Sequence, residues 1–493
     1  MFWTLFFKKY VYLQNKKKAM EKLIGRESEI YELQQAFNSA KSEFVVIYGR
    51  RRVGKTFLVR HFFKDKYTFQ YVGAHRETTA VQLQHFAMSL TRYFGKTFGR
   101  MKSWAEAFSA LQTELESQQS KGRKVIFFDE MPWIDNKQSD FVRSLEYFWN
   151  SWAMYRDDIV LVACGSATSW MVDKLIENHG GLHGRITRRI HLHPFSLHEC
   201  KLYLSDRNID WDDYQIIQNY MIMGGIPYYL SLLESNLSLQ QNVDNLFFRR
   251  GALLSGEFDE LYNALFSKAD RYITIVEALA AHKEGMTRQE IIDTCGISGG
   301  GLTRILNNLE NCDFITHFSQ LGMKTNRVIY KLIDHYTLFY YKFIRNNHSG
   351  DENYWMHNFQ SRSVEVWEGY SFELVCLTHI FQIKHALGIS GIATEVSTWR
   401  SKSDNNEKGM QIDLIIKRVD KLTHLCEIKF SEKPYIITAD YEKRLKERMQ
   451  LFTDKTGLYR GVVQTFVTPF GLVKGKHTSM VHSEVTGKDL FAV

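Results

Sequence analysis

The order of apolar and polar positions divides the chain into segments of different periodicity. Between Glu43 and Pro194, apolar runs alternate with stretches of helical period, and the runs are Phe44–Tyr48, Phe69–Val72, Val125–Phe128 and Ile159–Cys164. Short, continuously apolar runs between helices are typical of parallel strands buried on both faces. This part of the chain therefore predicts an α/β unit.

The period changes twice further along the chain. From about Phe195 to Asp270 the pattern is helical, and residues 271–345 predict three helices and a hairpin. From about Trp367 a helix leads into strands again, which predicts a second α/β unit. We expect domains over 20–195, 196–270, 271–345 and 346–493.

Residues 1–19 stand apart from these units. Their apolar run ends at Phe7, far short of the ~20 residues that a membrane span needs. The basic residues follow the run, whereas in a signal peptide they precede it. We expect a disordered extension and no membrane span, and a peripheral amphipathic anchor stays open as the alternative.

Composition narrows the class of protein. The 493 residues are 44% hydrophobic and 24% charged, with a net charge of +8, which is typical of a globular protein. That surplus permits nucleic acid as a partner without arguing for it. The six cysteines are scattered, with no zinc-knuckle or redox-pair spacing, so we expect a reducing, cytoplasmic setting.

A phosphate-binding loop is the most specific motif. Gly49–Thr56 reads GRRRVGKT, which matches G-x-x-x-x-G-K-[ST] between a predicted strand and a predicted helix. The glycines let backbone N–H groups approach phosphate, Lys55 neutralises the β- and γ-phosphates, and the Thr56 hydroxyl ligates Mg²⁺. We expect ATP to contact Gly49, Arg50, Arg51, Arg52, Val53, Gly54, Lys55, Thr56 and Phe57.

The three consecutive arginines of this loop have two interpretations. Arg50, Arg51 and Arg52 add positive charge toward the nucleotide or a neighbouring subunit, or they form a solvated basic rim. The sequence does not distinguish between these two interpretations.

Two further strand ends complete the expected ATP site. The apolar run before Asp129 and Glu130 ends at the sheet edge where ligands bind, because a buried strand cannot hide carboxylates. Asp129 is expected to hold Mg²⁺ and Glu130 to activate the attacking water. Ser166, after the next strand, either senses the γ-phosphate or is a turn serine. Arg185 either stabilises transition-state charge, within the chain or across a subunit boundary, or belongs to a surface basic cluster.

These motifs together resemble a known family. The combination consists of Leu23–Glu27, the phosphate loop, Phe127–Glu130 and Gly224–Leu230. It resembles the archaeal-type ATPases of the AAA+ superfamily over most of the chain from about Met20. The resemblance implies a P-loop NTPase fold of class α/β: an AAA+ core, a helical lid, a winged helix-turn-helix and often a C-terminal nuclease-like domain. It also implies that Gly25 and Arg26 lie near the adenine.

The segment after residue 271 has the element order of a winged helix-turn-helix. Thr287 and Glu290 form a capping box at the start of one helix, and the next helix carries apolar residues at helical spacing. Phe314–Tyr330 predicts a wing around Gly322. The second helix would present Thr303, Arg304, Asn307 and Asn308 outward, either to DNA in the major groove or to a neighbouring domain.

A second acidic site is expected near the C-terminus. Met410–Ile416 and Leu422–Lys429 predict a hairpin that brings Asp413 near Glu427, with Lys429 on the same face as Glu427. Two carboxylates and a lysine can hold Mg²⁺ or Mn²⁺ and activate water on a phosphodiester. The set resembles the PD-(D/E)XK nucleases of restriction-endonuclease-like fold, with Glu373 matching the helical acid; Ile412 replaces the proline of that pattern.

These features predict an intracellular Mg²⁺-dependent ATPase that controls a winged-helix and nuclease-like module on DNA. A different class stays open: a slow nucleotide-gated switch whose C-terminal domain binds protein or DNA without cleaving it. A homo-oligomer also stays open.

Overall fold

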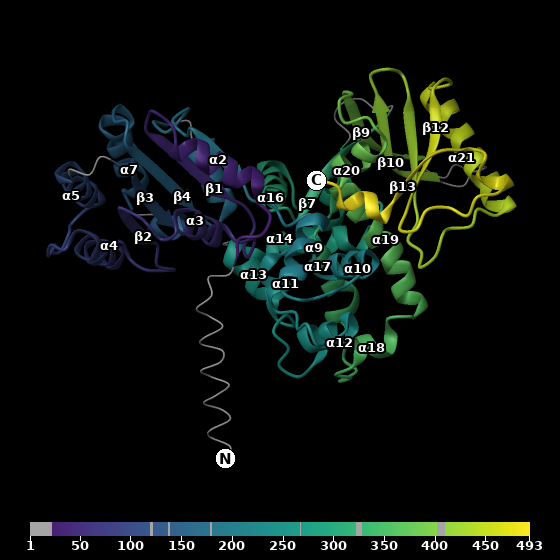
Figure 1. Cartoon of the computed structure of the whole chain (residues 1–493), viewed down its shortest axis with the longest axis horizontal. Coiled ribbons are helices and arrows are strands. Elements are labelled where there is room, and N and C mark those ends of the chain that lie inside the picture. Colours follow the sequence, from purple (N-terminus) through teal and green to yellow (C-terminus); the bar gives the residue numbers. More distant parts are fainter. Residues whose placement is uncertain are drawn as a thin grey trace, which may run out of the picture.

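The computed structural model describes residues 22–118, 122–136, 139–177, 180–266, 268–321, 328–401 and 410–493. The expected extension over residues 1–19 and the expected wing turn at Gly322 lie outside these ranges. Figure 1 shows one sheet at each end of an elongated molecule, with helices between them. In the described part of the chain, no helix combines the length and apolar character that membrane crossing requires.

The first sheet confirms the four apolar runs as strands. Its strands are β1 Glu43–Tyr48, β2 Phe69–Val72, β3 Lys124–Asp129, β4 Ile159–Cys164 and β5 Arg188–His191. All pairings are parallel, in the order β2-β3-β4-β1-β5. Phe44 and Val46 enter one hydrophobic core and Val45 and Ile47 another, so β1 is buried on both faces.

Strand β5 was not expected. It lies at the sheet edge, only Ile190 is fully buried, and two of its four residues are arginines. An edge strand needs no apolar partner on its outer side, so its sequence lacks the apolar run that identified the other strands. Arg188 and Arg189 therefore lie in a strand that no apolar run indicated.

Helices cover this sheet and fill the middle of the molecule. Around the sheet are α2 Glu27–Phe37, α3 Lys55–Phe63, α4 Thr79–Phe94, α5 Trp104–Ser117, α6 Met131–Ile134, α7 Phe141–Ser151 and α8 Thr168–Met171, followed by a π-helical turn over Val172–Ile176. The predicted helical stretch contains α9 Leu197–Asp206, α10 Asp213–Met223, α11 Pro227–Ser231, α12 Leu239–Val243 and α13 Glu257–Leu265.

The next segment has the predicted three helices and hairpin. These are α14 Ala269–Ala281, α15 Arg288–Cys295 and α16 Gly299–Asn311, then β7 Ile315–Gln320 and β8 Val328–Leu332. The capping box of Thr287 and Glu290 is present at α15. The short α17 His335–Phe339 and α18 Tyr354–Asn358 follow.

The second sheet joins this hairpin to the C-terminal strands. The added strands are β6 Met286–Thr287, β9 Thr394–Ser401, β10 Met410–Arg418, β11 Thr423–Ile428, β12 Val462–Thr468 and β13 Val481–Thr486, in the order β13-β12-β11-β10-β9-β7-β8-β6. Strand β7 pairs with β9 through Ser319–Ser397. The helices α19 Arg362–Thr378, α20 Ile380–Ala386 and α21 Ala439–Thr456 complete this end. The sheet thus crosses the predicted boundary at 345/346, and that boundary stays a prediction.

Candidate nucleotide site and C-terminal acidic site

The phosphate loop is shaped by two glycines. Gly49 has a φ of 135°, and a Cβ there would lie 2.4 Å from the carbonyl oxygen of Leu192. Gly54 caps α3 with a φ of 93°. Only glycine adopts these conformations without strain. The loop therefore turns directly from β1 into α3 and faces a cavity of about 380 Å³ that Gly54, Lys55 and Thr56 help to line.

Lys55 is held inside the loop. Its side chain is buried, and Nζ donates hydrogen bonds of 2.8 Å to the carbonyl oxygens of Gly49 and Arg50. Burial lowers the pKa of this ammonium group.

Thr56 and Asp129 bring two oxygen ligands together. The Thr56 hydroxyl donates to Asp129 Oδ1 at 3.1 Å, from the start of α3 to the end of β3. Burial, and then the charge of Glu130, raise the pKa of the Asp129 carboxyl. A hydroxyl and a buried carboxylate beside the phosphate loop are hard oxygen ligands of the type that Mg²⁺ prefers, so the residues present fit this ion.

Glu130 and Ser166 form a second contact at this edge of the sheet. Glu130 Oε2 accepts hydrogen bonds from the Ser166 backbone N–H at 3.1 Å and from its hydroxyl at 2.8 Å. Both residues line the same cavity. Arg185, by contrast, is exposed and does not line it. The site as described therefore contains the predicted base but not this arginine.

The three loop arginines separate. Arg51 and Arg52 both line the cavity, and Arg50 does not. Arg50 is 1% exposed, forms an ion pair with Asp334, and stacks at 4.8 Å over the Phe314 ring, so it is not part of a solvated rim. Arg52 pairs with Glu257 and lies 4.3 Å over the Tyr228 ring. Two of the three thus bind acidic groups far along the chain.

Part of the cavity lining is aromatic. Arg26 lines it, donates to the Val53 carbonyl oxygen at 3.2 Å, and lies 4.5 Å over the Phe195 ring. Gly25 does not line it. Phe195, Tyr203 and Tyr228 contribute to the lining, and the sequence predicted none of them as ligand contacts. In the sequence, only the position of Phe195 shortly after β5 and of Tyr228 within the Gly224–Leu230 motif indicated that these residues lie near the site.

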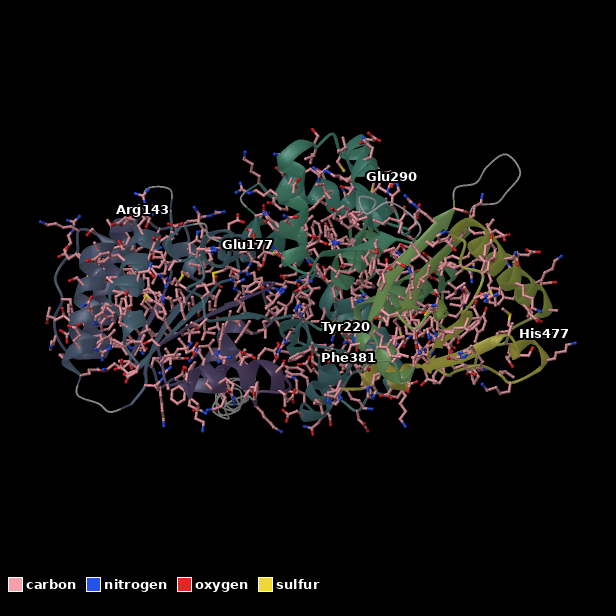
Figure 2. All side chains as sticks on the ribbon, turned by 90° about the horizontal axis from the view of Figure 1, so that it is seen from above. Arg143, Glu177, Tyr220, Glu290, Phe381 and His477 are labelled. Carbon is pink, nitrogen blue, oxygen red and sulfur yellow. The ribbon has the colours of Figure 1, made fainter. Side chains whose placement is uncertain are left out.

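The outward face of α16 differs from its prediction at one position. Thr303, Arg304 and Asn307 are exposed, but Asn308 is buried and donates to the Tyr272 hydroxyl at 2.8 Å. The rotation of the helix places position 308 beside Leu309, on the face of α16 that packs against α14, so the Asn308 side chain points inward. The exposed face borders a groove of about 460 Å³ whose opposite wall includes Asp173 and Glu177. In Figure 2, Glu177 lies where the ATP-binding end meets the middle of the molecule.

The C-terminal acids come together. Strand β10 pairs with β11 in an antiparallel register that ends with Leu414 opposite Cys426, and Asp413 and Glu427 are the next residues beyond this pair. Burial, and then the negative charge of Asp413, raise the pKa of Glu373 on α19 to about 8. The positive charges of Lys331 and Lys429 act in the opposite direction and lower this pKa. The predicted hairpin is therefore present, and Glu373 belongs to the same electrostatic cluster.

Cations already surround Glu427. Lys429 Nζ lies 2.9 Å from Glu427 Oε1, Arg448 pairs with Oε2, and the Tyr441 hydroxyl donates to Oε1. Although burial opposes it, these charges lower the pKa of Glu427. A divalent ion at Glu427 Oε2 would compete with Arg448 for this oxygen.

Three residues of this site were missed. Tyr441 and Arg448 lie on α21, and Lys331 lies on β8 of the hairpin before the expected domain boundary. Lys331 is 2% exposed, and its Nζ has no hydrogen-bond partner within the described residues. No local pattern marks such residues, because only the sheet that joins β8 to β10 brings them close.

Residues 23–233 match the family model of an "ATPase domain predominantly from Archaea". With the phosphate loop, Asp129 and Glu130 in place, this segment is an archaeal-type ATPase domain. The protein is an ATPase that binds ATP.

Individual relatives are similar at lower identity. An uncharacterized protein of Methanocaldococcus jannaschii is 25% identical over 413 residues, which cover 83% of this chain and 88% of that protein. An uncharacterized ATP-binding protein of the same organism is 40% identical over 43 residues, covering 9% of this chain and 73% of that protein.

Two solved structures are similar to part of this chain. The Walker-type ATPase of Pyrococcus abyssi has a TM-score of 0.47 and 20% identity over 64% of this chain and 95% of that one. The ORC2 protein of Aeropyrum pernix has a TM-score of 0.40 and 14% identity over 65% and 93%. Both likenesses are too distant to indicate activity or partners.

Proposed function

We propose that this ATPase is Mg²⁺-dependent and that its nucleotide cycle controls a winged helix and a nuclease-like unit on DNA. One observation carries the proposal: Arg50 and Arg52, inside the phosphate loop, pair with Asp334 and Glu257. Both acids lie outside the ATPase domain at 23–233. A change in the loop conformation on phosphate binding is therefore transmitted through these two ion pairs to the segments that follow the domain.

The chemistry assigns a role to each site residue. Lys55 and the loop N–H groups hold the phosphates, and Thr56 with Asp129 holds the metal. A bound Mg²⁺ ion supplies charge neutralisation between the β- and γ-phosphates. Glu130 takes the proton of the attacking water, and Ser166 orients the Glu130 carboxylate. Arg185 acts from a neighbouring copy, if the protein forms a homo-oligomer.

DNA is the partner that fits both accessory units. The exposed Thr303, Arg304 and Asn307 of α16 give a small reading surface with one cation. Glu373, Asp413, Glu427 and Lys429 provide the acids and the lysine of a phosphodiester-cleaving site, with Mg²⁺ or Mn²⁺ as its metal. All six cysteines are free thiols, which fits the cytoplasm.

The test combines two measurements on the full chain. Steady-state ATP hydrolysis is measured with and without duplex DNA for wild type and Glu130→Gln, together with plasmid integrity. We expect DNA to change the wild-type rate, and we expect the Gln variant to bind ATP without turning it over. Normal hydrolysis by Glu130→Gln removes the proposed base, and a rate independent of DNA removes the DNA partner.

A nucleotide-gated switch is the second candidate. Arg448 and Lys429 both neutralise Glu427, and the exposed face of α16 looks onto Asp173 and Glu177. Both features fit a resting state in which the C-terminal domain binds protein or DNA without cleaving it. Slow turnover together with an intact plasmid under Mg²⁺ and Mn²⁺ would favour this function.

A further inference from the structure

A cluster of two imidazoles and one carboxylate lies outside both sites described above. His191 is the last residue of β5, His193 follows two positions later, and Asp313 follows the end of α16. His191 Nε2 lies 3.3 Å from Asp313 Oδ2, and His193 Nδ1 lies 2.9 Å from Asp313 Oδ1. We propose that these three residues bind a divalent transition-metal ion, for which Zn²⁺ is the best match.

The spacing suits a four-coordinate ion. With Zn–N distances of 2.0–2.1 Å, the edge of a tetrahedron of ligand atoms is roughly 3.3 Å long. One ligand atom from each residue can be chosen so that all lie within 4.8 Å of one another. Closing this group around an ion therefore shortens the distances between ligand atoms by no more than about 1.5 Å.

Two buried atoms of the cluster have no well-formed hydrogen bond. His191 Nε2 and Asp313 Oδ2 lie 3.3 Å apart as an ion pair, but this contact does not have hydrogen-bond geometry, and neither atom has another hydrogen-bond partner among the residues that the structure describes. Buried polar atoms are nearly always well hydrogen-bonded, so this contact is one that a bound ion would improve. A metal ion between them would satisfy both.

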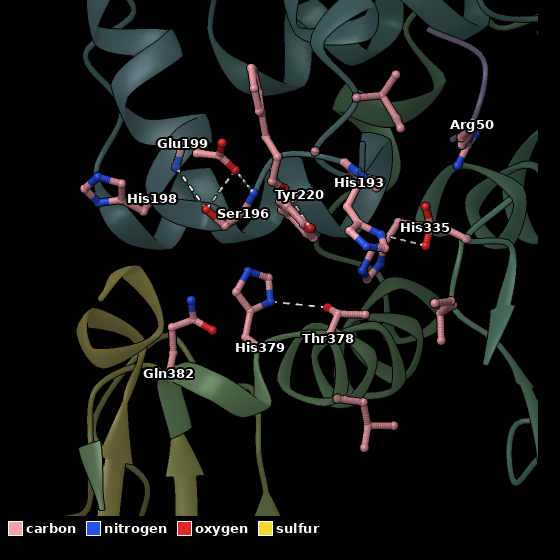
Figure 3. Close-up of a pocket in the computed structure, with 18 of the residues that line it drawn as sticks. Arg50, His193, Ser196, His198, Glu199, Tyr220, His335, Thr378, His379 and Gln382 are labelled. Carbon is pink, nitrogen blue, oxygen red and sulfur yellow. Dashed lines mark hydrogen bonds and ion pairs between the residues drawn. The ribbon is translucent and has the colours of Figure 1, made fainter. Parts of the chain in front are cut away.

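The cluster is also held in place. The Tyr48 ring stacks on His191 with 4.7 Å between centroids, and Asp313 has a left-handed φ of 56° with its N–H bonded to the Glu310 carbonyl oxygen. His193 is 59% exposed, so an ion can enter from that side. His193 and Asp313 also line a cavity of about 530 Å³. Figure 3 shows the His193 side chain in this cavity, with its interaction drawn as a dashed line.

The ion would join the ATPase domain to the segment that follows it. His191 and His193 flank Leu192, whose carbonyl oxygen would lie 2.4 Å from a Cβ at Gly49 of the phosphate loop. Asp313 belongs to the end of α16. Two neutral imidazoles select Zn²⁺ and similar ions over Mg²⁺, which prefers oxygen ligands. The site is thus chemically distinct from the Thr56–Asp129 pair.

The experiment uses Co²⁺ as a spectroscopic probe and Zn²⁺ as its competitor. Full-length protein without a histidine tag carries Asp413→Ala, so that the C-terminal acids do not contribute. Titration with Co²⁺ is followed by visible absorption, and bound metal is counted after dialysis. The variants are His193→Ala and Asp313→Asn; asparagine tolerates the left-handed backbone of Asp313. The control is His85→Ala, an exposed histidine of α4.

We expect one Co²⁺ ion per chain with tetrahedral absorption, displaced by Zn²⁺ and not by Mg²⁺. His193→Ala and Asp313→Asn should weaken binding by at least about tenfold, and His85→Ala should not. Thermal unfolding without metal establishes that each variant is folded. Uptake equal in all four proteins, or no uptake above background, overturns the proposal and leaves a histidine–aspartate ion-pair cluster.

Discussion

Asp334 binds Arg50 of the phosphate loop with one carboxylate oxygen and caps α17 with the other. Arg50 Nη1 pairs with Oδ1, and Oδ2 accepts from the Thr337 N–H at 3.1 Å and from its hydroxyl. Both partners of the ion pair are almost fully buried. The loop that receives phosphate and the start of a distant helix are therefore fixed by one side chain.

Breaking this pair should destabilise the protein. Asp334→Asn keeps an acceptor for the helix cap but leaves Arg50 buried without a counter-charge, which costs roughly 3–5 kcal/mol. Urea unfolding measures the loss. The matched control is Arg60→Ala, which breaks the exposed pair with Asp65 and should cost less than about 1 kcal/mol. Equal losses in the two variants would show that burial of Arg50 does not matter.

Lys55→Ala should abolish ATP binding. Nζ is the cation nearest the expected phosphates, and the alanine methyl group offers neither charge nor donor. Fluorescent-nucleotide titration is the measurement, and unfolding in the absence of nucleotide tests that the variant is folded. Binding within about tenfold of wild type would contradict the assignment, since loss of a charged contact exceeds 1.4 kcal/mol.

Ser166→Ala should slow turnover without preventing ATP binding. The hydroxyl contact with Glu130 is lost, but the Ser166 backbone N–H keeps its own bond to the same oxygen. We expect kcat to fall about tenfold, less than in Glu130→Gln, because a hydrogen bond to a charged carboxylate is worth about 1.5 kcal/mol or more. A KM that rises while kcat is unchanged would instead mean that Ser166 serves only in nucleotide binding.

Glu373 should make stability depend on pH. Burial raises its pKa from 4.5 to about 8 in the folded protein, so the folded state binds an extra proton between these values. The resulting stabilisation is fully present below pH 4.5 and is lost as pH rises through 8, at up to about 1.4 kcal/mol per pH unit. Glu373→Gln cannot titrate, so its unfolding midpoint should fall less than that of wild type between pH 6 and 8.5. Parallel curves would place the Glu373 pKa near its ordinary value.

Arg448→Ala should strengthen Mn²⁺ binding at the C-terminal acids. Removing this guanidinium frees Glu427 Oε2 for a metal ion. Isothermal titration with Mn²⁺ should show tighter binding than in wild type, and Glu427→Gln should remove it. Arg444→Ala, on the exposed side of the same helix α21, is the control and should behave as wild type. If Arg448→Ala and Arg444→Ala bind alike, Arg448 does not compete with metal.

The sequence by itself determined the elements that local patterns encode. The four apolar strands, the glycine-bounded loop before Lys55, the carboxylates after β3 and the β10–β11 hairpin follow from side-chain period and turn chemistry within a few residues.

Only the tertiary structure decided which distant residues meet. Arg50 and Asp334 are 284 positions apart, and Lys331 reaches Glu373 only because β8 joins the C-terminal sheet through β7 and β9. The sequence pattern did not predict edge strand β5 or the burial of Asn308. Which strand lies at the edge of a sheet, and which side of a helix is buried, depend on the neighbouring elements. Burial and charge pairing are set by what packs opposite, which no local window contains.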